Sequence, residues 1–274
     1  MRPIRRLRRL TVLPLAVALF SPVPFAAPAA AATPARYTVT DLGSLGTGDY
    51  SVATAVNNAG TVVGYSNPTS LLVHGFRWSA GTLTDLGAES GGYSWANAIN
   101  DAGQVAGTSV RTVGGYGYPV RWSADGLLQD LGGPVVNRLG VGNGIDPAGR
   151  VVGGQRPADS QGNPIAILYD QAGNQTLLGN PPESLGAANG INARGQIVGS
   201  SEVPDTLPSG SHAVTWKGGA PTDIGTVDGL RLSQANAVNA AGQVVGTADP
   251  GCTPCGSPRA WIWQAGGRSP RWTR

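Results

Sequence analysis

Residues 96–107, which read ANAINDAGQVAG, decide the fold of this chain because four other stretches repeat their pattern. The other copies begin at positions 53, 142, 188 and 235 and read ATAVNNAGTVVG, GNGIDPAGRVVG, ANGINARGQIVG and ANAVNAAGQVVG. A glycine recurs in them at spacings of 43, 46, 46 and 47 residues: Gly60, Gly103, Gly149, Gly195 and Gly242. A regular period of this length is typical of a repeat architecture.

Each copy predicts a β-hairpin. Asn or Asp opens a four-residue turn and Gly closes it, as in Asn100-Asp101-Ala102-Gly103, and this composition favours a type I turn with a side-chain cap on its first residue. The flanking runs alternate in polarity, which predicts two adjacent antiparallel strands. The 42 glycines and 21 prolines of the 274-residue chain oppose helix, whereas Val, Leu, Ile and Trp suit short strands.

Two more strand-like blocks follow the hairpins. The first ends in an aromatic residue in every copy: Trp78, Trp122, Tyr169, Trp216 and Trp263. The second closes four copies and reads Asp-Leu-Gly or similar, at residues 84–87, 129–132, 177–179 and 222–225. Four strands in about 45 residues match the size of one propeller blade.

The two ends of the repeat region predict a closed ring. Residues 37–43, Tyr-Thr-Val-Thr-Asp-Leu-Gly, are an unpartnered copy of the closing strand, and the fifth copy stops after Trp263 without one. The predicted fold is therefore all-β, a five-bladed β-propeller of four-stranded repeats closed by the N-terminal strand pairing into the last blade. An open β-solenoid is the alternative, but it gives no reason to split one repeat between the chain ends.

The first 32 residues are expected to be a signal peptide. Five arginines precede an apolar run at residues 10–20, and small residues at Ala30 and Ala32 suit cleavage near Ala32. The apolar run is too short to span a bilayer, so we expect a secreted, extracellular protein. General secretory and twin-arginine export both remain open. The expected organisation is residues 1–32 as signal peptide, 33–267 as five-repeat propeller and 268–274 as C-terminal tail.

Charge argues against nucleic acid as a partner. Without residues 1–32 the chain has 14 basic and 16 acidic residues, so the formal net charge of +3 comes from the leading arginines. The remaining basic residues are scattered and form no stripe that would neutralise phosphates. Stable membrane insertion is not expected either, and a monomer is predicted.

The repeats resemble those of the secreted HAF-repeat family, also called probable extracellular repeat proteins. The likeness runs from Asp41 to Trp263 and is closest in the turn block, for example Gly242-Gln243-Val244-Val245-Gly246. The His-Ala-Phe triplet that names the family never occurs here, and residues 74–76 and 212–214 come nearest to it. The resemblance implies a secreted repeat protein and carries no agreed catalytic or binding residues.

One polar residue per repeat is predicted to lie near the propeller axis, among small residues on the innermost strand: Thr54, Asn97, Asn143, Asn189 and Asn236. As a ligand site, these side chains would line a funnel that binds a sugar or another polar molecule. As a structural device, the amides would tie adjacent blades together through buried hydrogen bonds.

The histidines and the repeated acids are expected to be structural. His74 and His212 take matching places in non-adjacent blades, so a shared metal or base role is disfavoured against bonding to a neighbouring backbone group. The repeated acids, which might otherwise form a calcium ring, are expected to cap turns or bond backbone: Asp41, Asp85, Asp130 and Asp223. No metal or cofactor is predicted.

The only two cysteines, Cys252 and Cys255, lie in a loop of the last repeat. In an exported protein we expect them to form a disulfide, in preference to a redox dithiol or a zinc site.

The predicted function is a non-catalytic extracellular binding or scaffold module of unknown ligand. The variable loops all join the same pair of strands and so gather on one face, where a glycan or a protein would bind. The alternative is a carbohydrate-active enzyme of glycoside hydrolase type, by analogy with propellers whose funnels hold carboxylates. In that case Asp146, the one acid at an Asn turn position, would meet a second acid near the axis.

Overall fold

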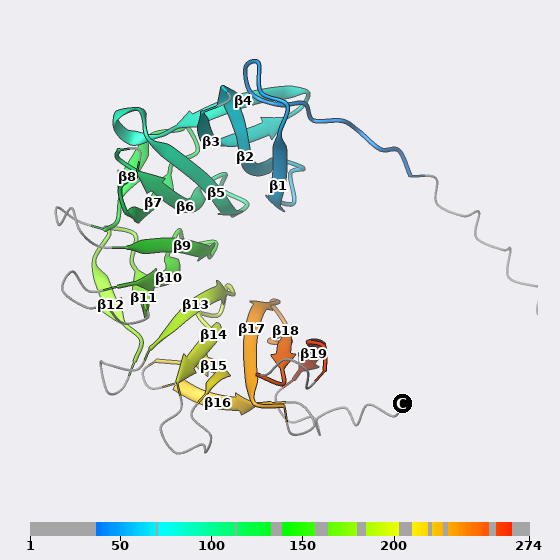
Figure 1. Ribbon diagram of the computed structural model, residues 1–274, viewed down its shortest axis with the longest axis vertical. Coiled ribbons are helices and arrows are strands. Elements are labelled where there is room, and N and C mark those ends of the chain that lie inside the picture. Colours follow the sequence, from blue (N-terminus) through cyan, green and yellow to red (C-terminus); the bar gives the residue numbers. More distant parts are fainter. Residues whose placement is uncertain are drawn as a thin grey trace, which may run out of the picture. The chain divides into compact units, whose positions relative to one another are not determined.

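The structure, a computed structural model, is built of β-strands with almost no helix (Figure 1). The described residues are 37–69, 71–112, 114–132, 139–156, 164–179, 185–202, 210–218, 221–226, 230–251 and 256–264. The chain divides into two units, Met1–Thr40 and Asp41–Arg274, and every strand described lies in the second. The predicted signal peptide and C-terminal tail lie outside the described residues. No helix in the described ranges is long and apolar enough to cross a membrane.

Five antiparallel sheets follow one another along the chain. Sheet 1 contains β1 (Ser51–Val56), β2 (Val62–Thr69), β3 (Leu72–Ser79) and β4 (Thr82–Gly87). Sheet 2 contains β5 (Tyr93–Ile99), β6 (Val105–Val110), β7 (Gly117–Trp122) and β8 (Leu128–Asp130). Sheet 3 contains β9 (Gly140–Ile145), β10 (Val151–Gln155), β11 (Ile165–Tyr169) and β12 (Gln175–Leu177). Sheet 4 contains β13 (Gly186–Ile191), β14 (Ile197–Glu202), β15 (Ser211–Trp216) and β16 (Pro221–Gly225). Sheet 5 contains β17 (Leu232–Val238), β18 (Val244–Asp249) and β19 (Arg259–Trp263).

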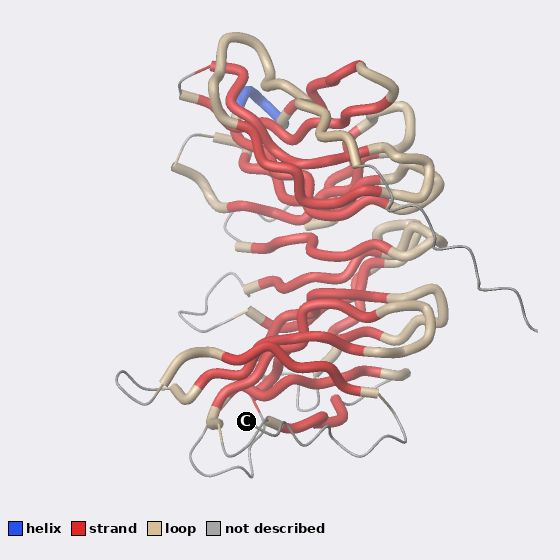
Figure 2. The backbone as a smooth tube through the Cα atoms, turned by 90° about the vertical axis from the view of Figure 1, so that its right-hand side faces the viewer, coloured by secondary structure: helices blue, strands red, loops and turns tan. Residues whose placement is uncertain are grey.

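Within each sheet the strands pair with their neighbours in the chain, so every repeat is an antiparallel meander. The prediction of an all-β repeat fold is confirmed, with four strands in sheets 1–4 and three in sheet 5. Helix among the described residues is confined to one short 3₁₀ segment, η1 (Glu89–Gly91), as Figure 2 illustrates. The density of Gly and Pro explains this, because neither residue sustains a helix.

The repeated turn between the first two strands forms for a local reason. Its glycine has a positive φ of 76° to 87° in all five copies, a conformation that strains residues with a Cβ atom. The glycine amide donates to the carbonyl oxygen of the first turn residue at 2.9–3.0 Å. The side-chain oxygen of that first residue accepts from the amide four residues on, at 2.9–3.1 Å. The predicted side-chain cap is therefore confirmed.

The apolar core lies between sheets rather than within one. Four buried clusters each combine residues of two successive sheets, and Trp122 illustrates how they meet. Its ring is fully buried, and its Nε1 donates to the carbonyl oxygen of Leu86 in the preceding sheet at 3.0 Å. Because a single sheet cannot bury its faces alone, each sheet depends on its neighbours for stability.

The ring closure predicted from the sequence is not confirmed. Sheet 5 has three strands, and no strand is assigned to residues 37–50. The outer faces of the two terminal sheets are uncovered as well: Val245 of sheet 5 is 45% exposed, whereas Val198, at the same repeat position in sheet 4, is fully buried. Ala53 of sheet 1 is likewise exposed, and its counterpart Ala96 in sheet 2 is not.

Candidate functional site

The polar residue of each first strand is the extra residue of a β-bulge. The pairing of β1 with β2 skips from Ala53 to Ala55 and leaves Thr54 unpaired, and the other four sheets have the same irregularity at the matching place. A bulge re-aims the side chain it carries. The sequence reaches this geometry by placing small residues on both sides of the bulged one.

The bulged side chains bind successive sheets to one another. Asn97 Nδ2 donates to the carbonyl oxygen of Gly142 at 2.8 Å, across the boundary between sheets 2 and 3. The other sheets repeat this bond, with Thr54 Oγ1 to Ala96 at 2.7 Å, Asn143 to Ala188 at 3.0 Å and Asn189 to Ala235 at 2.8 Å. Asn236, in the last sheet, is exposed and makes no such bond to a described residue. Four of the five residues that might have lined a ligand funnel therefore use a side-chain donor to tie two sheets together.

A second ladder runs through the turns. Asn57 Nδ2 donates to the carbonyl oxygen of Asn100 at 3.2 Å, and Asn100 Nδ2 donates to that of Asp146 at 2.9 Å. Asn192 continues the series to Asn239 at 3.0 Å. Because a carboxylate has no donor, Asp146 interrupts the ladder between sheets 3 and 4.

Asp146 is held by a local partner instead. Its side chain is 1% exposed, and its Oδ2 accepts from both Nε and Nη2 of Arg150 at 2.7 Å. Arg150 stands where the second, fourth and fifth repeats have glutamine. Asp in place of Asn at position 146 and Arg in place of Gln at position 150 therefore complement each other. The two hydrogen bonds from Arg150 and the burial of the carboxylate are typical of a structural ion pair.

Each histidine bonds a carboxylate rather than a backbone group. His74 Nδ1 lies 2.9 Å from Asp85 Oδ2 in sheet 1, and His212 Nδ1 lies 2.9 Å from Asp223 Oδ2 in sheet 4. The expected backbone partner was therefore wrong, because the antiparallel register brings the acid of the fourth strand beside the histidine of the third. The structure describes the two pairs in separate sheets, so they do not form one site.

The repeated acids also cap their own turns, as predicted. Oδ1 of each acid accepts from the amide of the glycine two residues on, at 2.7–2.9 Å, in the series Asp41, Asp85, Asp130 and Asp223. The described residues contain no group of three or more His, Cys, Asp or Glu that could hold a metal ion. Cys252 and Cys255 lie outside the described residues, so their pairing stays a prediction.

One polar cluster in sheet 2 was not foreseen. Arg111 donates to Glu89 Oε2 at 3.2 Å, forms a second ion pair with Asp130 and lies 4.0 Å from the ring centroid of Tyr118. The Tyr118 hydroxyl also donates to Glu89. Burial, reinforced by this bond to Glu89, raises the pKa of Tyr118 to about 12. The only signal in the sequence was Tyr118 at the position that histidine occupies in sheets 1 and 4.

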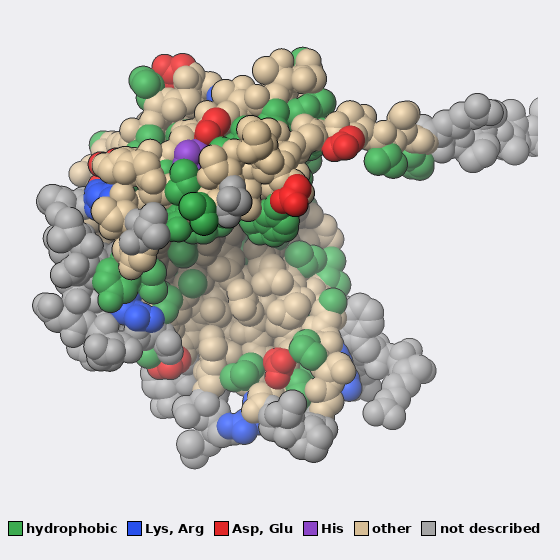
Figure 3. All heavy atoms as spheres, turned by 45° about the horizontal axis from the view of Figure 1, so that its top comes forward, with side chains coloured by type: hydrophobic (Ala, Val, Ile, Leu, Met, Phe, Trp, Pro, Cys, Tyr) green, Lys and Arg blue, Asp and Glu red, His purple; other side chains and the backbone are tan. Residues whose placement is uncertain are grey.

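Two arginines add further ties between sheets. Arg77 Nη2 donates to the carbonyl oxygens of Gly103 and Ser123 in sheet 2, at 2.9 and 3.0 Å. Arg121 donates in the same way to Gly149 and Gln171 of sheet 3. Burial lowers the pKa of both guanidinium groups from its usual value. Among the side chains coloured in Figure 3, Lys and Arg lie apart from one another and form no basic patch on that face.

Comparison with protein-family models gives no match, and comparison with curated proteins gives none either. The inter-sheet hydrogen bonds are thus the main guide to which polar residues hold the fold and which remain for function.

Proposed function

We propose that the chain is a secreted, non-catalytic extracellular module, built as a closed five-bladed β-propeller, that binds a glycan or a protein or acts as a scaffold. The observation that carries this proposal is the use of the repeated polar side chains as ties between sheets. Bulge amides, turn amides and buried arginines donate to main-chain oxygens of the next sheet, for example Asn97, Asn100 and Arg121. Residues that vary between repeats then remain to recognise a partner.

Local geometry near the N-terminus supports ring closure. Asp41 Oδ1 accepts from the Gly43 amide at 2.9 Å, and Gly43 has a φ of +79°. Ser51 Oγ donates to the Gly43 carbonyl oxygen at 2.9 Å. Sheet 4 has the same arrangement at its closing strand, where Asp223 Oδ1 accepts from Gly225 and Ser233 Oγ donates back to it. The end of the segment that would close sheet 5 thus makes the same capping hydrogen bonds as the end of β16, which supports the proposed closure.

The repeat register specifies the contacts of the closed form. Asp223 pairs with Val214 and Thr222 with Thr215 in sheet 4, so Asp41 would pair with Trp261 and Thr40 with Ile262 in sheet 5. Ser233 Oγ accepts from the Ala213 amide at 2.8 Å, and Ser51 Oγ would accept equally from Ala260. Closure would also cover the exposed faces at Val245 and Ala53.

Closure is tested by disulfide trapping. Thr40→Cys and Ile262→Cys would be combined in a background where Cys252 and Cys255 are changed to serine. Directly paired strand residues have Cα atoms about 4.5–5.5 Å apart, which suits a disulfide. We expect rapid oxidation within a monomer, seen by peptide mass mapping and light scattering, while the one-residue slip Thr40→Cys with Trp263→Cys should cross-link poorly. Failure of the first pair, or cross-linking only between two chains, contradicts the closed ring.

The binding role is tested with the mature domain on glycan and protein arrays, alongside a panel of glycoside hydrolase substrates. We expect a partner on an array and no turnover. Turnover of any of these substrates by the purified, folded protein would instead support the enzyme and contradict the proposal.

A further inference from the structure

The sheets differ from one another at one corner, where the first two strands of a repeat meet the variable loop. In sheet 5 this corner consists of Leu232 and Gln234 on β17 with their partners Asp249 and Thr247 on β18. Hereafter "corner" means these four positions in any repeat. Because repeats share one register, the corner can be compared from sheet to sheet, residue by residue.

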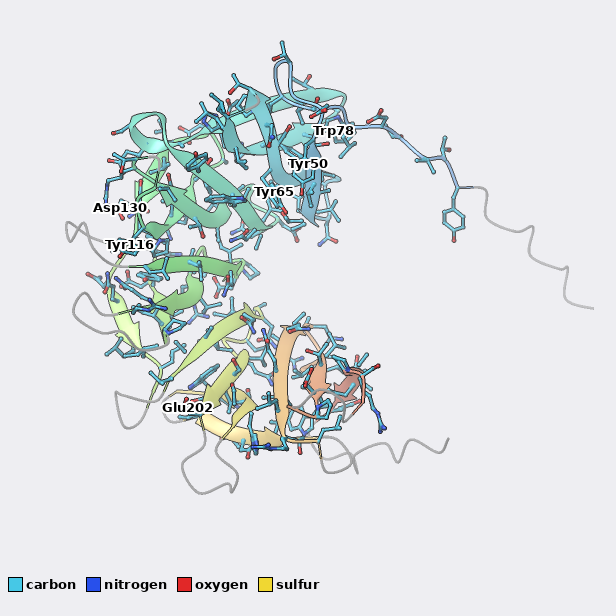
Figure 4. The ribbon with its side chains drawn as sticks, viewed as in Figure 1. Tyr50, Tyr65, Trp78, Tyr116, Asp130 and Glu202 are labelled. Atoms are coloured by element: carbon cyan, nitrogen blue, oxygen red, sulfur yellow. The ribbon has the colours of Figure 1, made fainter. Side chains whose placement is uncertain are left out.

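Aromatic rings occupy the corners of the first two sheets. In sheet 1, Tyr50 and Tyr65 have ring centroids 6.2 Å apart, and Figure 4 shows the two residues close together at this end of the sheet. The side-chain hydrogen bond between Tyr65 and Tyr50 is the largest cause of the raised pKa of Tyr65. In sheet 2, Tyr93 and Trp95 have centroids 6.1 Å apart. In both sheets, two of the four corner positions thus hold aromatic side chains that lie near each other.

The corners of sheets 4 and 5 have small or polar residues and a cavity in the same place. All four corner residues of sheet 4 line a cavity of about 200 Å³, which includes Ala187 and Ser200 where sheet 2 has Trp95 and Thr108. All four corner residues of sheet 5 line a cavity of about 490 Å³. Sites for small ligands measure about 300–1,000 Å³, so of these two cavities the one at the sheet 5 corner falls within that range.

The chemistry of this cavity suits a hydroxyl-rich, uncharged ligand. Asp249 Oδ1 is fixed by the Gly251 amide at 2.7 Å, which leaves Oδ2 to accept hydrogen bonds. Gln234 and Thr247 are exposed and bond no described residue through their side chains, so an amide and a hydroxyl supply both donors and acceptors. Leu232 and Pro258 add apolar surface. Carboxylate, amide and hydroxyl groups beside an apolar wall match the hydroxyl edge and C–H face of a pyranose ring.

We propose that the sheet 5 corner is a binding site for a pyranose sugar. This inference rests on the proposed function as a binding module and names the site and the ligand class. In sheets 1 and 2 aromatic rings stand at corner positions instead. The corner therefore holds aromatic rings in some repeats and a cavity in others.

The test places an aromatic ring at the corner, as in sheet 1. Thr247→Tyr places a tyrosine at the repeat position of Tyr65, and Asp249→Asn removes the carboxylate while it keeps an oxygen for the Gly251 amide. Thr222→Tyr, at an exposed position on β16 outside the corner, is the matched control. The probes are methyl α-D-glucopyranoside, methyl α-D-mannopyranoside, methyl β-D-galactopyranoside and N-acetylglucosamine, titrated by calorimetry into the mature protein.

We expect one of these sugars to bind, Thr247→Tyr to abolish binding, Asp249→Asn to weaken it about tenfold or more, and Thr222→Tyr to leave it unchanged. Sugar binding that survives Thr247→Tyr contradicts the assignment of the site to the sheet 5 corner but still supports the proposed function as a binding module. Absence of sugar binding by the folded protein overturns the inference, and an array partner of another class then still supports the proposed function. Binding of Ca²⁺ alone, lost in Asp249→Asn, also overturns it, because the corner is then a cation site.

Discussion

The side-chain amide of Asn97 donates to the main-chain oxygen of Gly142 at 2.8 Å, so a bulge residue of sheet 2 supplies a hydrogen-bond donor to the first strand of sheet 3. The same bond recurs one repeat later between Asn143 and Ala188. Successive sheets are thus joined by directional contacts as well as by apolar packing. These contacts fix how one repeat sits on the next, which apolar packing alone specifies less strictly.

Asn143→Ala should lower the free energy of unfolding by about 1–3 kcal/mol, because it removes the side-chain donor to the carbonyl oxygen of the fully buried Ala188. Urea denaturation of the mature domain measures this loss. Asn143→Thr is the matched variant, since Thr54 makes the equivalent bond to Ala96 through its hydroxyl at 2.7 Å. Threonine should recover part of the stability, and equal losses for both variants would argue against the inter-sheet bond.

Asn236→Ala distinguishes the closed ring from an open one. In the repeat register its partner would be the carbonyl oxygen of Ala53, which only closure brings into reach. If the ring closes in solution, we expect a loss of stability similar to that of Asn143→Ala. A change within about 0.5 kcal/mol, the usual range for an exposed residue, would speak for an open end.

Asp146 and Arg150 should be coupled in a double-mutant cycle. Arg150→Gln alone leaves the carboxylate buried without a cation and should destabilise by about 3–5 kcal/mol. Asp146→Asn alone leaves a guanidinium whose side chain is 33% exposed and can reach water, so its loss should be smaller, about 1 kcal/mol. The double variant restores the Asn and Gln of the neighbouring repeats, and the side-chain amide that it introduces at position 146 can donate to the carbonyl oxygen of Asn192. We expect it to be close to wild type in denaturant unfolding, and additive losses would contradict the coupling.

The strands and turns could be predicted from the sequence because they depend on short-range chemistry. The turn beginning at Asn100 needs an acceptor side chain at its first residue and a Gly at its fourth, and both are visible in the letters. The strand order followed from the short connections between consecutive strands. The predicted pairing of the N-terminal strand with sheet 5 is not seen in the structure. That pairing joins the two ends of the repeat region, and short-range sequence patterns do not specify it.

The polar contacts between sheets were harder to predict because they depend on register and bulges. That the Asn set would tie the sheets was one of two interpretations, and the bulge that aims each side chain leaves no mark in the sequence besides small neighbours. The partner of His74 was predicted wrongly, since the pairing of β3 with β4 decides that Asp85 lies beside it. The inter-sheet bonds of Arg121 were missed for the same reason.

Asp101 should make the boundary between sheets 1 and 2 sensitive to acid. Hydrogen bonds from the main-chain amide and side chain of Asn58, at 2.9 and 2.7 Å, lower the pKa of Asp101 below its ordinary value. A lowered pKa stabilises the folded state above about pH 4, and that contribution is lost as the pH falls through the folded value. Denaturation midpoints between pH 7 and 2 should therefore fall less steeply for Asp101→Asn, and parallel curves would contradict this.

Tyr118 should give the opposite dependence at alkaline pH. Burial and the hydrogen bond to Glu89 raise the pKa of Tyr118 to about 12, whereas an unfolded tyrosine titrates near 10. Protonated Tyr118 therefore stabilises the folded state fully below about pH 10, and this contribution disappears as the pH rises toward 12. Absorbance at 295 nm should reveal a late-titrating component in the wild type that is smaller by one tyrosine in Tyr118→Phe. Tyr116→Phe is the control, because Tyr116 is 57% exposed, and it should leave the late component in place.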